Sequence, residues 1–229
     1  MKNVRVIIPA YNEENSIAKV IDAIPEMIAE VIVVNNASTD QTAQIASSAG
    51  ATVLHESNMG YGYACLKGIE YLQNKKDPTA IVVFMDGDYS DFPEEMPKIL
   101  APILEQNIDF VVGARVKSKR EAGSMTLPQI FGNWLATSLM RAFFHSNFTD
   151  LGPFRAIKYE KLLELNMEDK TYGWTVEMQL KVLKKNMTYT EVEMNYRNRI
   201  GTSKVSGTVK GAVMAGVKIL GWIFKYSFK

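Results

Sequence analysis

Short apolar runs alternate with helical patterns through the first 114 residues of this 229-residue chain. The runs are Val4–Ile8, Val31–Val34, Thr52–Leu54, Ile81–Met85 and Phe110–Gly113. They are nearly continuous in apolar residues, as strands covered on both faces of a sheet should be. Between them, apolar residues recur at helical spacing, in the sets Ile17, Val20, Ile21, Ile24 and Met96, Ile99, Leu100, Ile103. This alternation predicts an α/β fold with a mostly parallel, Rossmann-like sheet flanked by helices.

The second half of the chain is less regular, with helical stretches expected over 128–144 and 174–184. No Ser/Gly-rich linker separates the halves, so we expect one domain over residues 1–229. The lone Cys65 excludes an intrachain disulfide, and Met1 runs directly into a strand-like segment without a leader pattern. These features predict a cytoplasmic protein.

Charge is distributed unevenly although the chain carries 26 basic and 25 acidic side chains. Residues 1–110 hold 7 basic and 16 acidic residues, residues 111–229 hold 19 and 9, and no acidic residue follows Glu193. The second half is therefore expected to meet something anionic. Phosphorylated small molecules or an anionic membrane face fit better than nucleic acid, because no nucleic-acid-binding motif accompanies the charge.

Polar residues follow three of the predicted strands, where ligands bind on parallel sheets. The segments are VIIPAYNEE (6–14), VIVVNNASTD (31–40) and FMDGDYSDFPE (84–94). The first two are also typical of strand ends and helix caps. In the third, Asp86 and Asp88 lie one residue apart at the end of a buried run. Two carboxylates without His or Cys suit Mg²⁺ or Mn²⁺ held together with a diphosphate.

These segments, in this order, resemble the family 2 glycosyltransferases of the GT-A type. Four later motifs extend the resemblance to a bacterial branch related to dolichyl- and polyprenyl-phosphate sugar transferases: VGAR (112–115), TDLGPFRAI (149–157), YGWTVEMQLKV (172–182) and YRNRIGTSKVSGT (196–208). The resemblance implies a nucleotide-sugar-binding half over 1–114, an acceptor-side half over 115–206 and an amphipathic tail over 207–229.

The resemblance also implies roles for individual residues. The nucleoside of the donor would be held by Pro9, Tyr11, Glu13 or Glu14, Asn36 and Asp40. Asp86 and Asp88 would take the metal and the diphosphate. The donor and acceptor phosphates would be surrounded by Arg115, Arg199, Ser203 and Lys204. Relatives often carry Asp-Asp or Asp-Asn where this chain has Asn35-Asn36, so the choice of base stays open.

Two hypotheses for the acceptor, a phosphate and a hydroxyl compound, require different chemistry at the site. A phosphate is already anionic at neutral pH and needs cations, whereas a sugar hydroxyl needs a general base. Glu177 and Asp150 are the acids best placed by motif to serve as that base.

The tail from Gly207 to Tyr226 is expected to form an amphipathic helix. Lys210, Lys218 and Lys225 fall on one predicted face, and Val213, Val217, Leu220 and Phe224 on the other. Its apolar stretches are shorter than the roughly 20 residues that a membrane span needs. The helix either lies at a membrane interface or packs on the domain.

We therefore expect an inverting, metal-dependent hexosyltransferase that uses a nucleotide diphosphate sugar and a polyprenyl or dolichyl phosphate acceptor. A UDP-glucose-like donor is favoured over a GDP-sugar, and peripheral contact with the inner membrane face is expected. A soluble hydroxyl acceptor, a binding protein without turnover and a homo-oligomer remain open.

Overall fold

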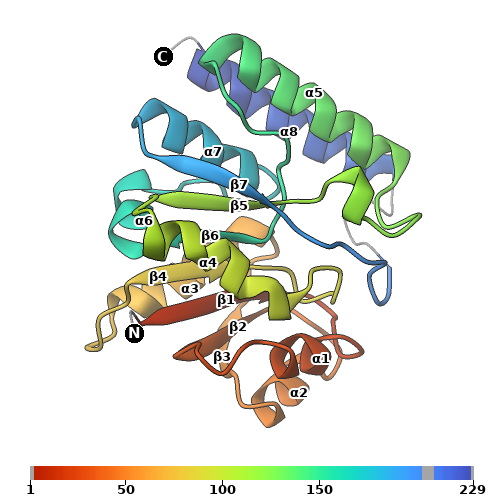
Figure 1. Ribbon diagram of the computed structural model, residues 1–229. Helices are drawn as coiled ribbons and strands as arrows, with labels where there is room; N and C mark the ends of the chain where they lie inside the picture. Colours follow the sequence, from red (N-terminus) through yellow and green to blue (C-terminus); the bar gives the residue numbers. More distant parts are fainter. Residues whose placement is uncertain (1–2, 203–208, 228–229) are drawn as a thin grey trace.

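The computed structural model describes residues 3–202 and 209–227 and has a seven-stranded sheet with helices on both faces (Figure 1). The strands are β1 (Val4–Ala10), β2 (Glu30–Asn36), β3 (Thr52–Glu56), β4 (Ile81–Phe84), β5 (Phe110–Ala114), β6 (Arg155–Lys158) and β7 (Tyr189–Glu193). The helices are α1 (Ile17–Asp22), α2 (Thr42–Ser48), α3 (Tyr61–Gln73), α4 (Met96–Glu105), α5 (Leu127–Phe144), α6 (Tyr159–Leu165), α7 (Trp174–Lys184) and α8 (Val209–Ser227). Short 3₁₀ turns occupy Pro93–Glu95 and Lys117–Lys119.

The sheet order is β3-β2-β1-β4-β6-β5-β7. All neighbouring pairs are parallel except those of β6, which runs antiparallel to both β4 and β5. The predicted single α/β domain with a mostly parallel sheet is confirmed, and the five predicted apolar runs are its first five strands. β6 and β7, which no periodic pattern indicated, bring the second half of the chain into the same sheet.

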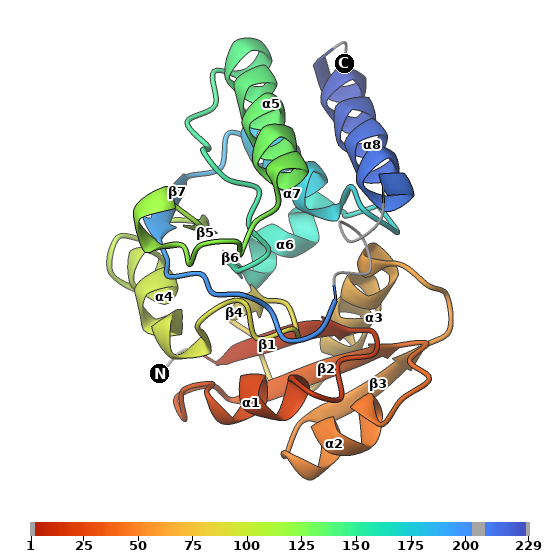
Figure 2. The ribbon, with the colours of Figure 1, turned by 90° about the vertical axis from the view of Figure 1, so that its right-hand side faces the viewer.

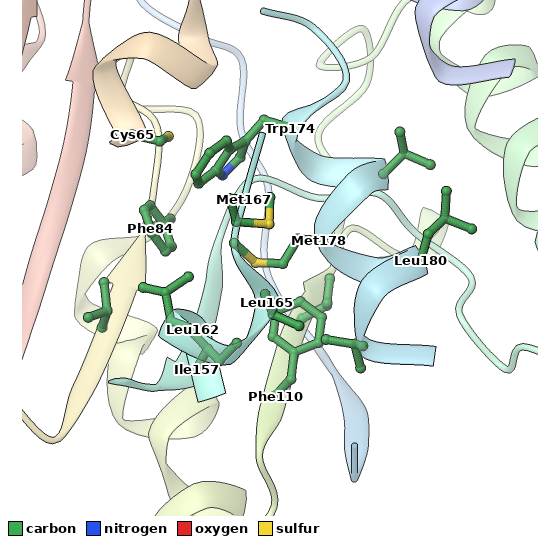
Figure 3. Packing of buried hydrophobic residues seen from close by; sticks show 14 of the residues in the cluster. Cys65, Phe84, Phe110, Ile157, Leu162, Leu165, Met167, Trp174, Met178 and Leu180 are labelled. Carbon is green, nitrogen blue, oxygen red and sulfur yellow. The ribbon is translucent and has the colours of Figure 1, made fainter. Parts of the chain in front are cut away.

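Two apolar layers cover the faces of the sheet. One lies beneath α1 and α4 and includes Ile17, Val20, Met96 and Ile99. The other lies beneath α3 and α7, where the ring of Trp174 packs edge-on against Phe84 with 5.8 Å between centroids (Figure 3). Burying large side chains on both faces makes the sheet a rigid base for the loops at its carboxyl end.

The α8 helix packs beside α5 and against α7 (Figure 2). Two residues of the predicted apolar face are exposed, Val217 at 62% and Phe224 at 43%, whereas Trp222 and Ile223, which lie outside that set, are buried. The reason is a specific partner, because the Trp222 indole N–H donates to the buried carboxylate of Asp169 at 2.6 Å. No helix within 3–202 or 209–227 is long and apolar enough to cross a membrane.

Candidate active site

A cavity of about 330 Å³ opens beyond the carboxyl ends of β4 and β5. Its polar wall contains Asp86, Asp88, Arg115 and Arg199. Its other wall is formed by residues from α5, α7 and α8, among them Pro128, Gly132, Trp174, Ala215, Gly216 and Ile219. The cavity therefore joins a charged wall, called here the charged floor (Asp86, Asp88, Arg115 and Arg199), to a largely apolar side.

The two aspartates that follow β4 differ in their environments. Asp88 is 4% exposed, and its Oδ1 accepts hydrogen bonds from the Ser90 amide at 2.9 Å and the Ser90 hydroxyl at 2.6 Å. Asp86 Oδ1 is buried and has no hydrogen-bond partner among the described residues. Desolvation, followed by the charge of Asp88, raises the pKa of Asp86 to about 7. Arg199, Tyr61 and Arg115 oppose this rise only in part. A buried carboxylate oxygen without a hydrogen-bond partner, beside a second carboxylate, is a suitable position for a cation.

These two carboxylates fit a hard divalent cation, because oxygen is the ligand that Mg²⁺ and Mn²⁺ prefer. The described residues contain no cluster of three or more His, Cys, Asp or Glu that could hold a metal by itself. The remaining ligands would then come from water or from a bound diphosphate.

Arg115 links the end of β5 to the loop before β6. Its Nε and Nη2 donate to the two oxygens of Asp150 at 2.8 and 2.7 Å, and its amide donates to Asp150 Oδ2 at 2.8 Å. Burial opposes the charge on Arg115, but Asp150 outweighs it and raises the pKa of the guanidinium. Burial likewise disfavours the Asp150 carboxylate, yet Arg115 lowers its pKa. Asp150 is therefore an ion-pair partner and a poor proton acceptor.

Arg199 reaches the site from the segment after β7. Its Nη1 lies 3.1 Å from Asp88 Oδ2, and its Nη2 lies 3.1 Å from Glu13 Oε1. It thereby joins the ends of β1 and β4. The other two predicted phosphate-binding residues, Ser203 and Lys204, lie outside the described residues.

The residues assigned to the nucleoside do not line the cavity. Pro9 and Tyr11 are partly buried at the end of β1. The Asp40 carboxylate accepts the amides of Glu14 at 3.2 Å and Thr42 at 3.0 Å, and the Glu14 carboxylate accepts the Gln41 amide at 3.1 Å. These contacts tie the loops after β1 and β2 together.

Asn36 supports the start of α3. Its side chain donates to the carbonyl of Asn58 at 2.6 Å and accepts the Gly60 amide at 2.8 Å. Gly60 adopts φ 153°, and a Cβ on Gly62 would lie 2.0 Å from the Asp169 carbonyl oxygen. The Gly60-Tyr61-Gly62 sequence thus lets α3 approach the 168–173 loop and brings Tyr61, which our sequence reasoning missed, to the cavity. The two glycines at a helix start were the available signal.

Glu177 lies away from the cavity lining and is completely buried. Its two oxygens accept the amides of Glu168 and Asp169, each at 2.8 Å, and Lys181 Nζ lies 2.7 Å from Oε1. The residue organises the loop that carries Thr171 and Tyr172 into the cavity wall. This geometry is that of a residue that positions a loop. The role of Glu177 as a general base, which a hydroxyl acceptor would need, stays a prediction.

Comparisons with known proteins agree with this architecture. The model of the family described as glycosyl transferase family 2 matches residues 5–165. A dolichyl-phosphate hexose transferase of Haloferax volcanii is 31% identical over 218 residues, which cover 91% of this chain and 89% of the relative. An undecaprenyl-phosphate mannosyltransferase of Micrococcus luteus is 29% identical, with 93% and 92% covered.

A solved structure of similar fold is glucosyl-3-phosphoglycerate synthase of Mycobacterium tuberculosis, in complex with Mn²⁺, UDP and glucosyl-3-phosphoglycerate. Its TM-score is 0.78 at 20% identity, with 99% of this chain and 80% of that chain covered. The shared fold alone would not identify the activity, because one fold hosts many functions. The sequence matches identify the family. The chain belongs to glycosyl transferase family 2 and is a glycosyltransferase.

Proposed function

We propose that the protein transfers a hexose from a UDP-sugar to a polyprenyl phosphate, with inversion at the anomeric carbon and with a divalent cation. The observation that carries the proposal is the cavity, whose charged floor continues into an apolar side between α5 and α8. A phosphate bound to a long hydrocarbon chain needs both surfaces. Two relatives are named as transferases to undecaprenyl phosphate and dolichyl phosphate, which supports this acceptor class.

The donor side must stabilise a leaving diphosphate. Breaking the sugar–phosphate bond develops negative charge on the diphosphate, which preorganised cations stabilise. Asp86 and Asp88 would hold Mg²⁺ or Mn²⁺, which would supply charge neutralisation to the leaving group when bound. Arg199, which contacts Asp88, contributes a second positive charge. A solved structure of the same fold contains Mn²⁺ with UDP, which favours a uridine donor.

The acceptor side provides cations and leaves few proton acceptors. Arg115 lines the cavity and is fixed by its paired hydrogen bonds to Asp150. Asp150 and Glu177, the two predicted bases, are engaged by Arg115 and by backbone amides. Because an acceptor phosphate is already anionic, it can attack the anomeric carbon directly, and a single displacement inverts the configuration.

An exposed apolar surface adjoins the apolar side of the cavity. On α5, Leu127 is 81%, Phe131 60% and Trp134 59% exposed, and on α8, Met214 is 52% exposed. The rings of Phe131 and Trp134 lie 5.7 Å apart between centroids. Exposed apolar patches of this kind mark protein or membrane contacts. We assign this surface, called here the α5/α8 surface, to peripheral contact with an anionic membrane that carries the lipid acceptor.

A thermal-shift titration tests the donor and metal proposal. We expect UDP with Mn²⁺ to raise the melting temperature clearly, since a ligand at about 100 times its Kd stabilises the native state by roughly 2.7 kcal/mol. UDP with EDTA should give a much smaller shift, and GDP a smaller shift than UDP. Equal shifts for UDP in Mn²⁺ and in EDTA would remove the metal from the proposal.

Vesicle sedimentation tests the membrane contact. The double substitution Phe131→Ser and Trp134→Ser should weaken binding to anionic vesicles at least tenfold, because burial of each such side chain contributes roughly 1.5–3 kcal/mol. Leu163→Ser, at a 39% exposed position on α6, serves as the control. Deleting the tail is a poor alternative because it also removes the buried Trp222. If the double variant sediments with vesicles as the natural protein does, the surface does not contact the membrane. If the double substitution instead converts a dimer to a monomer, the surface is a contact between two copies of the chain.

A further inference from the structure

Arg199 holds the carboxylate that the divalent cation would use. Its guanidinium bridges Asp88 Oδ2 and Glu13 Oε1, both at 3.1 Å, and its side chain is 29% exposed. Asp88 contributes one oxygen to this bridge and the other to Ser90. In this arrangement Arg199 neutralises Asp88 in the way that a bound cation would.

The backbone around Arg199 is fixed to the Asp-Gly-Asp segment. The amides of Arg197 and Ile200 donate to the carbonyls of Ser90 and Asp88, each at 3.0 Å. The Arg197 guanidinium lies between two rings, 3.5 Å from the centroid of Tyr89 and 4.0 Å from that of Phe92. With the backbone anchored on both sides of Arg199, a change of partner requires rotation of its side chain alone.

One polar atom of Arg199 shows that its present partners are incomplete. Nε is buried and has no hydrogen-bond partner among the described residues. A buried N–H without a partner costs free energy, and a guanidinium is well suited to two-pronged contact with phosphate oxygens. A diphosphate arriving beside Asp88 would offer acceptors to this side chain.

From these contacts we propose that Arg199 is a placeholder for the divalent cation, so that metal enters the site together with the nucleotide diphosphate and binds poorly alone. A cation on Asp88 Oδ2 would lie close to the guanidinium and be repelled by it. The diphosphate removes this conflict because it draws Arg199 away and adds negative charge. Metal and nucleotide therefore favour each other's binding, and by linkage the coupling is reciprocal. The inference rests on the metal dependence of the proposed function.

Mn²⁺ binding measured by electron paramagnetic resonance, without any sugar donor or turnover, tests this inference. In the absence of nucleotide, Arg199→Gln should bind Mn²⁺ about tenfold more tightly than the natural protein, the order expected from losing two partly exposed ion pairs. In the presence of UDP the difference in affinity should reverse, and Arg199→Gln should bind Mn²⁺ more weakly than the natural protein does. Arg141→Gln, which removes an exposed charge from α5, should change neither affinity.

Arg199→Lys separates competition from a general charge effect. A lysine keeps the charge but lacks the fork that reaches Asp88 and Glu13 together, so its Mn²⁺ affinity without nucleotide should lie between those of the natural protein and Arg199→Gln. An unchanged or weaker affinity of Arg199→Gln for Mn²⁺ alone, with UDP-dependent Mn²⁺ binding intact in the natural protein, would overturn the placeholder. If the natural protein binds no Mn²⁺ even with UDP, the metal dependence of the proposed function fails instead.

Discussion

Asp88→Asn should lower the rate of hexose transfer by about a thousandfold and leave the protein folded. Asparagine has nearly the same shape and can still accept both hydrogen bonds from Ser90. It removes the negative charge that faces Arg199 and that would hold the cation. Asp88 would act through the cation that it holds, and loss of a preorganised electrostatic contact to the developing charge costs about 10²–10³ in rate. Transfer of radiolabelled sugar from UDP-hexose to undecaprenyl phosphate measures the effect.

Asp91→Asn is the matched control for this substitution. Asp91 lies three residues further along the same segment, is 2% exposed, and has an Oδ2 without a partner among the described residues. Burial, together with the charges of Asp86 and Asp88, raises its pKa well above the usual range. Asparagine therefore resembles its protonated form, and activity should stay within a few-fold. Equal losses in both variants, or more than a tenth of the activity remaining in Asp88→Asn, would contradict the assigned role.

The sequence predicted those parts of the site that follow directly from strand ends. Asp86 and Asp88 come after an apolar run, and the parallel order of the strands places them at the edge of the sheet where ligands bind. Arg115 also follows a strand, β5, but its role was predicted from the family resemblance of the VGAR motif. Local pattern and chain order were sufficient for the two aspartates.

Other parts depend on partners that are distant in the sequence. The short strand β6 begins with Arg155, a fully buried charge that donates to the carbonyls of Leu151, Gly152 and Thr175. Apolar periodicity does not indicate such a strand. The buried face of α8 likewise includes Trp222, whose indole N–H donates a hydrogen bond to Asp169, 53 residues away. An isolated helical pattern cannot reveal that partner.

The nucleoside residues show a third limit of sequence reasoning. Asp40 and Asn36 stand at strand ends as ligands would, yet their side chains hold neighbouring backbone amides in this structure. Caps and ligands use the same residue types, because both roles require short side chains with oxygen acceptors. Their assigned contacts with a nucleoside remain predictions.

Glu177→Ala should lower the free energy of unfolding by about 3–5 kcal/mol, the range expected when one partner of a buried ion pair is removed. The substitution leaves Lys181 buried at 6% exposure, and it removes the acceptor for the amides of Glu168 and Asp169. Urea unfolding followed by circular dichroism measures the loss. Glu164→Ala is the control, because Glu164 also pairs with a lysine but is 49% exposed, and its loss should cost less than about 1 kcal/mol.

Glu177→Gln then distinguishes the two acceptor classes. Glutamine keeps one carbonyl acceptor for the loop amides, so the fold should survive with a smaller loss of stability. If Glu177 only positions the loop and the acceptor is a phosphate, transfer should stay within about tenfold of the natural protein, below the roughly 10²–10⁴-fold contribution of a general base. A thousandfold loss, with UDP binding and melting temperature unchanged, would instead identify Glu177 as a base and favour a hydroxyl acceptor. The buried position of its carboxylate, engaged by two amides and Lys181, leads us to expect the first result.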